Sequence, residues 1–185
     1  MASRIVDKSI KPAHLVVAPG VELTRPADTN AYAVGDAIAS TTVAGDVTPL
    51  TFAAANEPGF VGRIVGARLI TDTATATGAM RLHLFNTTPF AVGGFQADNA
   101  ALALTYTALK TGSAGALPNY LGWIDFSSFV AHSASSVAVG ACDQTELYFD
   151  CPATSSLIYG LLEARAIFTP ASAQRFSAVL DILRS

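Results

Sequence analysis

The three histidines are the first residues to consider for catalysis or metal binding, because imidazole acts as a general base and as a metal ligand near neutral pH. His14, His83 and His132 lie far apart, and none is three or four residues from a carboxylate or a cysteine. The carboxylates occur singly, so no acid/base pair of the kind that cleaves glycosidic bonds is recognisable. We therefore predict no catalytic, metal or cofactor site, and a protein that is not an enzyme.

Nucleophile and phosphate-binding motifs are also missing from the sequence. The serines do not include a Gly-x-Ser-x-Gly nucleophile elbow. Gly59, Gly62 and Gly66 make a glycine-rich stretch, but it lacks the spacing and the Lys-Ser/Thr ending of a phosphate loop. Cys142 and Cys151 could oppose each other across a hairpin as a disulfide; because nothing indicates export, two reduced thiols are the preferred interpretation.

The composition indicates an assembly component. Of the 185 residues, 51% are hydrophobic and only 14% are charged, against about a quarter in an average globular domain. A protein that stays alone in water normally keeps its surface charged and free of large apolar patches. A chain with so few charges is expected to bury part of its exterior against copies of itself or against other proteins.

Charge and hydropathy also limit the partners. The net charge is −3 and no basic run occurs, which argues against direct nucleic-acid binding. The longest apolar run near the C-terminus, residues 157–162, is far shorter than the ~20 residues of a membrane helix, so no membrane partner is predicted. The first residues lack a signal-peptide stretch, which predicts a cytoplasm-like location unless the protein is carried out inside a larger particle.

Turn signals at short intervals separate β-favouring segments along the whole chain. This pattern predicts an all-β sandwich of about eight strands, in one domain that spans residues 21–185. The last two segments, 158–169 and 175–183, are expected to pair as a final hairpin. The segment that begins at Asp98 is the one place where a short, side-chain-capped helix is expected.

Alternation of apolar and polar residues predicts which side chains face the core. In residues 80–85, Arg81 and His83 are expected to point outward while the residues between them point inward. In residues 62–72, Ile64 is expected on the same face as Arg68.

The first twenty residues differ from the rest and contain Lys8, Lys11 and His14. We predict an extended N-terminal arm, residues 1–20, that packs against a neighbouring subunit or a supporting surface. An edge strand of the same domain and a frayed terminus are the alternatives.

Several short segments carry a resemblance. Residues 21–36, VELTRPADTNAYAVGD, resemble the opening of small head proteins of tailed bacteriophages. Matching segments follow in chain order, and the resemblance covers most of residues 21–185: GARLITD at 66–72, RLHLFN at 81–86, DNAAL at 98–102, LGWIDF at 121–126 and IYGLLE at 158–163.

The resemblance implies a capsid cement or decoration protein. It implies a jelly-roll-type sandwich, commonly a homotrimer, that binds the outer capsid surface of the virion and bridges subunits of the major capsid protein. Besides the three basic residues of the arm, we expect Arg68, Arg81, His83 and Arg165 to lie on outward faces and to reach the polar rims of such contacts.

Two other classes remain as alternatives. A receptor- or carbohydrate-binding module of a tail or fibre would share the fold and would expose aromatic side chains, but Trp123 is expected in the core. An enzyme on a cupin-like barrel would need clustered histidines and carboxylates, which the scattered histidines argue against.

Overall fold

The β-favouring segments of the sequence form strands, and the turn signals fall between them. The computed structural model describes residues 14–43, 46–55, 58–73, 78–87, 97–102, 119–133, 135–142 and 147–184, and in these ranges it contains no helical element. The strands of the described residues are β1 (His14–Thr24), β2 (Ala37–Ile38), β3 (Leu50–Ala53), β4 (Val61–Thr71), β5 (Met80–Phe85), β6 (Tyr120–Phe126), β7 (Val130–His132), β8 (Ser135–Cys142), β9 (Leu147–Asp150), β10 (Leu157–Ala164) and β11 (Arg175–Arg184). None of the described ranges holds a helix with the length and apolar character needed to cross a membrane.

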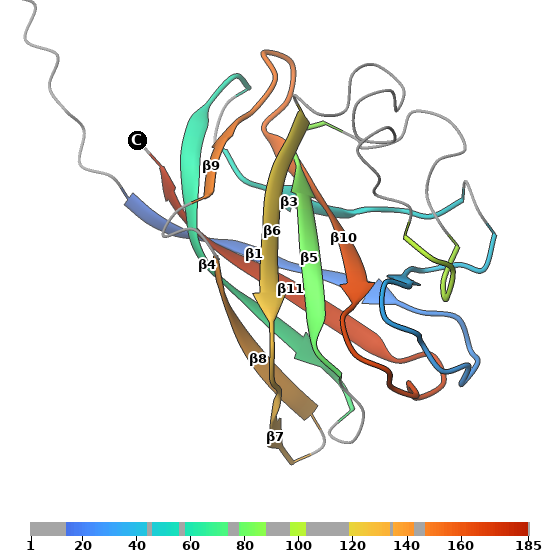
Figure 1. Ribbon diagram of the computed structural model, residues 1–185. Helices are drawn as coiled ribbons and strands as arrows, with labels where there is room; N and C mark the ends of the chain where they lie inside the picture. Colours follow the sequence, from blue (N-terminus) through green and yellow to red (C-terminus); the bar gives the residue numbers. More distant parts are fainter. Residues whose placement is uncertain are drawn as a thin grey trace, which may run out of the picture.

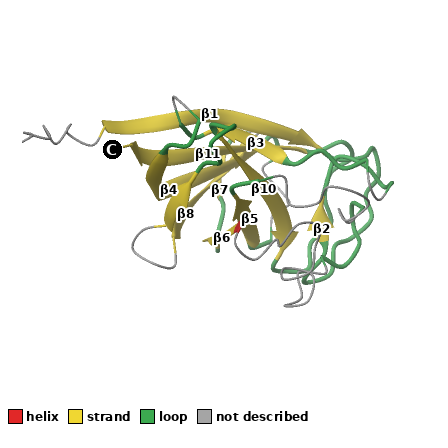
Figure 2. Cartoon of the chain, turned by 90° about the horizontal axis from the view of Figure 1, so that it is seen from above, coloured by secondary structure: helices red, strands yellow, loops and turns green. Residues whose placement is uncertain are grey.

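The strands make two antiparallel sheets packed as a β-sandwich (Figures 1 and 2). The first sheet runs β1–β11–β4, with β8 and β9 on the far side of β4 and β7 beside β8. The second sheet runs β6–β5–β10, with β2 and β3 on the far side of β10. β8 joins the sheets, because it pairs with β4 along most of its length and with β6 through Ala141 and Cys142.

The core lies between the inner faces of the two sheets, as the alternation predicts. In β5, Met80, Leu82 and Leu84 are completely buried in it. In β11, every second residue from Phe176 to Ile182 is buried as well. The all-β class and the inward faces of these two strands are therefore confirmed.

One face assignment in β4 is wrong because of a β-bulge. Asp181 pairs with Gly66 and Ile182 pairs with Ile64, so Val65 is an extra residue on β4. A single extra residue moves the side chains before it to the opposite face. Ile64 therefore points into the core, away from the face that carries Arg68.

The predicted final hairpin is also wrong. β10 pairs with β2, β3 and β5 in the second sheet, whereas β11 pairs with β1 and β4 in the first. The connection between them crosses from one sheet to the other, and short connections do so at the end of a sandwich as readily as they close a hairpin. Sequence proximity alone gives no sign of that choice.

Two smaller expectations change. The predicted boundary between an arm and the domain at residue 20 falls inside β1, whose residues 14–18 pair with β11, so the edge-strand alternative describes residues 14–20. Residues 1–13, with Lys8 and Lys11, lie outside the described residues. The short helix expected from Asp98 is a turn in residues 97–102 that bridges Ala101 to Asp36.

Candidate functional site

The outer face of the second sheet carries a group of polar side chains, which we call the Arg81 cluster (Arg81, His83, Asp125, Glu163 and Arg165). Strand register places Arg81 of β5 between Asp125 of β6 and Glu163 of β10. Both oxygens of Asp125 accept from Arg81, Oδ1 from Nε at 2.6 Å and Oδ2 from Nη2 at 2.7 Å. The paired, planar geometry fixes both side chains at the surface of the sheet.

His83 lies at the centre of the Arg81 cluster and uses both ring nitrogens. Nε2 is 2.9 Å from Oε2 of Glu163, and Nδ1 is 2.9 Å from the hydroxyl of Tyr120. A carboxylate only accepts, so Nε2 carries the proton in that bond. His83 points away from the core as predicted, and it is buried under these neighbours.

Charge in the Arg81 cluster is held by mutual pairing. Burial by itself raises the pKa of Glu163, but hydrogen bonding to His83 and the nearby Arg165 outweigh burial and leave that pKa lowered. Burial raises the pKa of Tyr120 to about 12. The hydrogen bond to Asp125 raises the pKa of Arg81. The cluster is thus a set of satisfied ion pairs, with neither nitrogen of His83 left to serve as a base.

Trp123 extends the Arg81 cluster with an aromatic surface. It is the direct partner of His83 in the pairing of β5 with β6, and the guanidinium of Arg81 lies 4.7 Å from the centre of its ring. The side chain is 36% exposed, so the prediction that it belongs to the core is wrong. The physical reason is parity: Ile124 and Phe126 face inward from β6, which turns Trp123 and Asp125 outward.

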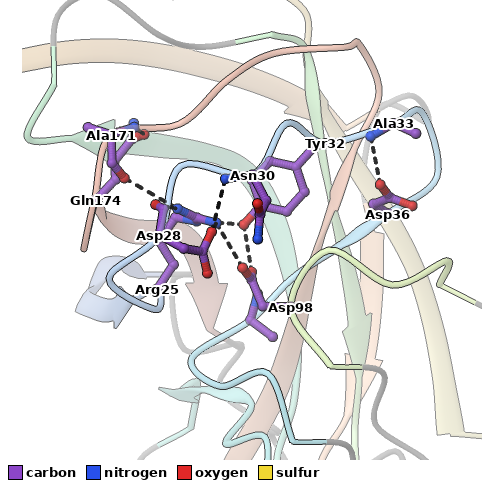
Figure 3. A network of polar contacts seen from close by, with 10 residues as sticks. Arg25, Asp28, Asn30, Tyr32, Ala33, Asp36, Asp98, Ala171 and Gln174 are labelled. Atoms are coloured by element: carbon purple, nitrogen blue, oxygen red, sulfur yellow. Dashed lines mark hydrogen bonds and ion pairs between the residues drawn. The ribbon is translucent and has the colours of Figure 1, made fainter.

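A second charged group lies at the end of the sandwich, and we call it the Arg25 network (Arg25, Asp28, Tyr32 and Asp98; Figure 3). Arg25, Tyr32 and Asp98 are buried, and the Asp28 side chain is 28% exposed. Arg25 donates from Nε to the Tyr32 hydroxyl at 2.6 Å and from Nη2 to Asp98 at 2.9 Å. It also donates to both the backbone oxygen and the side chain of Asp28, and to the backbone oxygen of Ala171. All five N–H groups of the guanidinium therefore have an acceptor.

The acceptor side of the Arg25 network is equally complete. Oδ1 of Asp98 accepts from the Tyr32 hydroxyl at 2.5 Å and from the backbone N–H of Ala39 at 2.8 Å. Burial, with the Asp98 carboxylate beside it, raises the pKa of Tyr32. The ring of Tyr32 stacks on Phe168, with 5.0 Å between centroids. The network therefore fastens the segment after β1 to residues 97–102 and to the connection between β10 and β11.

The Arg25 network gives a structural reason for two segments that the sequence analysis singled out. RPAD at 25–28 supplies the guanidinium and its nearest carboxylate, and Asp98 of DNAAL supplies the distant one. Asp36, in the same first segment, accepts from the backbone N–H of Ala33 at 2.6 Å and closes a turn. Sequence reasoning missed this pairing because the two carboxylates that Arg25 binds are 70 residues apart in the chain.

The outer face of the first sheet carries a row of exposed apolar side chains at one end. Register aligns Leu15, Leu183, Arg63 and Tyr148 in one row across β1, β11, β4 and β9. Val17 and Val61 flank this row, and the members of β1 and β9 are strongly exposed, Leu15 by 62% and Tyr148 by 68%. We call this surface the apolar band (Leu15, Val17, Val61, Tyr148 and Leu183).

An open groove of about 510 Å³ lies at the β9 end of the apolar band. Most of the described residues that line it are apolar or aromatic, and Arg63 and Asp150 are charged. The lining residues are Val61, Gly62, Arg63, Tyr148, Phe149, Asp150 and Leu183. Phe149 packs so close to Gly62 that a Cβ there would lie 2.7 Å from its ring. The close packing of β9 on β4 beside the groove therefore requires a glycine at position 62.

The other predicted contact residues lie apart from one another. Arg68 is on the outer face of the first sheet, where it pairs with Asp181 at 3.3 Å, and Arg165 is exposed beside Glu163. His14 opens β1 opposite Arg184. Of the predicted contact residues in the described ranges, Arg81, His83 and Arg165 come together around Glu163 of β10. Sequence reasoning did not identify Glu163 as their neighbour.

The described residues contain no group of three or more histidine, cysteine or acidic side chains that could hold a metal ion. Cys151 is a free, buried thiol, and burial raises its pKa, which suppresses the reactive thiolate. The side chain of Cys142 lies outside the described residues.

Comparison with known proteins does not assign the chain to a family. No protein-family model matches it, and no curated protein is significantly similar to it.

Proposed function

We propose that this protein is a structural virion protein: a capsid cement or decoration protein that associates with copies of itself, as a homotrimer, on the outer surface of a phage head. There it bridges neighbouring subunits of the major capsid protein. The apolar band is the observation that carries the proposal. It spans four strands of one sheet face, on a chain of which only 14% is charged, and such patches mark protein–protein contacts.

The mechanism is burial of apolar surface at repeated contacts. Apolar area removed from water contributes about 25 cal/mol per Å² before the costs of association are subtracted. A standard interface buries about 800 Å² on each partner, an area comparable to one face of a domain of this size. Repetition of one contact in a closed symmetric oligomer adds avidity, so that modest single contacts hold the shell firmly.

We further propose that the sandwich is a jelly roll. The nested order of strand pairs supports this: β1 with β11, β3 with β10, β4 with β8, and β5 with β6. Such nesting is expected when one long hairpin rolls up into two sheets, and jelly rolls are common in viral capsid proteins. The Arg25 network would hold the loops at one end of this sandwich in a fixed shape, which lowers the entropy cost of docking.

Binding to purified empty capsids of the virus that encodes the chain tests the proposal. The unaltered protein should sediment with the capsids, and Leu15→Asp should reduce bound protein about tenfold or more, because it buries an unpaired charge in an apolar contact. Ile167→Asp is the matched control. Ile167 is exposed by 77%, follows the C-terminal end of β10 and lies away from the apolar band. This variant should bind like the unaltered protein.

Absence of binding by the unaltered protein would overturn the capsid assignment. Equal binding by Leu15→Asp and the unaltered protein would separate the apolar band from capsid attachment and would remove the observation on which the proposal rests.

A carbohydrate- or receptor-binding module of a tail or fibre is the second candidate, and exposed Trp123 favours it. Sugar rings stack on flat aromatic faces, while Arg81 and Asp125 beside Trp123 offer a donor and an acceptor for hydroxyl groups. Binding of the unaltered protein to immobilised host glycans, abolished by Trp123→Ala, would support this candidate. The cement proposal predicts no glycan binding and unchanged capsid binding by that variant.

A further inference from the structure

We infer that the groove formed by β4, β9 and the end of β11 binds residues 1–13 of another copy of this chain. The inference deepens the proposed function, because it gives the self-association a defined site, but its test needs no capsid. The groove is open, apolar and large enough for several side chains. Three features of the N-terminal segment identify it as the occupant: the place where it enters the sandwich, its direction and its charge.

The N-terminal segment leaves the first sheet at the groove. His14 pairs with Arg184 of β11, and Arg184 pairs with Gly62 of β4, which lines the groove. The start of β1 and the C-terminus therefore lie at the same end of the sandwich, beside β4 and β9 (Figure 1). Thirteen residues reach about 40 Å when extended, which is enough to cross to a neighbouring subunit.

Chain direction favours a neighbour's groove over the segment's own. β1 runs from His14 into the sheet, so a segment that continues backward in the same direction leaves the molecule. To reach its own groove it would have to reverse just before His14.

Charge and hydropathy also match the segment to the body of the protein. Residues 1–13 contain Arg4, Lys8 and Lys11 against Asp7, which gives them a net charge of +2. Because the whole chain has a net charge of −3, the remaining residues have a net charge of −5. The segment also offers Ile5, Val6 and Ile10 to an apolar groove, at whose edge Asp150 is exposed. A basic segment with apolar side chains therefore suits an acidic partner with an apolar groove.

Each copy would give one segment and receive one. When the copies are arranged in a ring, such a contact joins two different surfaces and is heterologous. A closed ring of three is the form that the proposed homotrimer requires.

Cysteine cross-linking between full-length chains tests the position of the segment. A mixture of Ile5→Cys and Val61→Cys chains, one of them carrying a mass tag, should form a disulfide-linked heterodimer under mild oxidation. The matched control replaces Val61→Cys by Val34→Cys, since Val34 is similarly exposed but does not line the groove. The unaltered chain gives the background from Cys142 and Cys151. A heterodimer yield no higher than in the control would overturn the inference.

Mass in dilute buffer gives a second, independent readout. Val61→Asp should weaken self-association by roughly tenfold or more, measured by sedimentation, whereas Val34→Asp should keep the mass of the unaltered chain. A monomeric unaltered chain would overturn the inference. A double Ile5→Cys/Val61→Cys chain that cross-links only within itself would show that the groove takes its own segment, and would overturn the exchange as well. If Val61→Asp keeps its oligomeric mass but loses capsid binding, the shell occupies the groove: the inference fails and the proposed function survives.

Discussion

The Arg25 network and the Arg81 cluster are built from the same kinds of side chain, but they differ in where they lie. Arg25 and Asp98 are almost completely shielded from solvent, whereas 20% of the Arg81 side chain and 30% of Asp125 remain exposed. All the N–H donors of Arg25 bond to groups of its own chain, in its own loop and in two others. Arg81 is held at the surface of a sheet, next to an exposed tryptophan.

This difference separates structure from recognition. A buried ion pair costs much desolvation, so it persists only where every donor and acceptor is satisfied, and removing one partner leaves an uncompensated charge. A half-exposed pair contributes little to stability but remains available to a partner. We therefore expect substitutions in the Arg25 network to act on folding, and those in the Arg81 cluster to act mainly on pH response and binding.

Arg25→Ala should have the largest effect. It leaves the Asp98 carboxylate buried with no cation and should lower the free energy of unfolding by about 3–5 kcal/mol, measured by urea denaturation. Arg175→Ala is the control, since Arg175 pairs with Asp72 at 2.9 Å on the exposed surface, and it should remain close to the unaltered protein. A loss for Arg25→Ala as small as that of the control would contradict the comparison.

Tyr32→Phe should have the next largest effect. It keeps the ring stacked on Phe168 but removes the hydroxyl that joins Arg25 to Asp98, at a cost of about 1–3 kcal/mol. Tyr148→Phe provides a matched control on an exposed tyrosine and should leave stability unchanged. Thermal unfolding of the two variants side by side measures the difference; equal midpoints would mean that the hydroxyl contributes nothing to the network.

Glu163→Gln tests the Arg81 cluster through pH. Because its pKa in the folded state is lowered from the ordinary 4.5, ionised Glu163 stabilises the fold above that value, and this stability is lost as the pH falls through the lowered pKa. The variant should be less stable by about 1–2 kcal/mol near neutral pH. The difference from the unaltered protein should begin to shrink below pH 4.5 and become small only below the lowered pKa, where both side chains are neutral in the folded protein.

Urea denaturation at several pH values gives this difference directly. Asp46→Asn, a change at an exposed carboxylate, is the control for general charge effects. A gap between Glu163→Gln and the unaltered protein that stays constant down to pH 3 would show that the carboxylate charge is not what matters.

The sequence predicted those parts of the fold that depend on local pattern. Alternation placed the core residues of β5 and β11 correctly, since a half-buried strand imposes a period of two. It failed at Ile64, where a bulge that the pattern does not encode reverses the face. The prediction for Trp123 was wrong for the opposite reason, because it followed apolar bulk and ignored the alternation. Partners distant in the chain were invisible: Asp98 for Arg25, and Glu163 for His83. The apolar band follows from register across four strands, which one sequence does not reveal.

Arg68→Ala should have the smallest effect on stability. Arg68 and Asp181 lie 3.3 Å apart with 42% and 31% of their side chains exposed, on the same sheet face as the apolar band. An exposed pair of this kind contributes less than about 1 kcal/mol, so unfolding by urea should barely change. If the face is an interface, Arg68 lies where charged residues set the salt dependence of association, and the variant should bind capsids with a weaker dependence on salt. A loss of stability above about 2 kcal/mol would instead place this pair with the Arg25 network, since only a buried, fully committed ion pair costs that much to break.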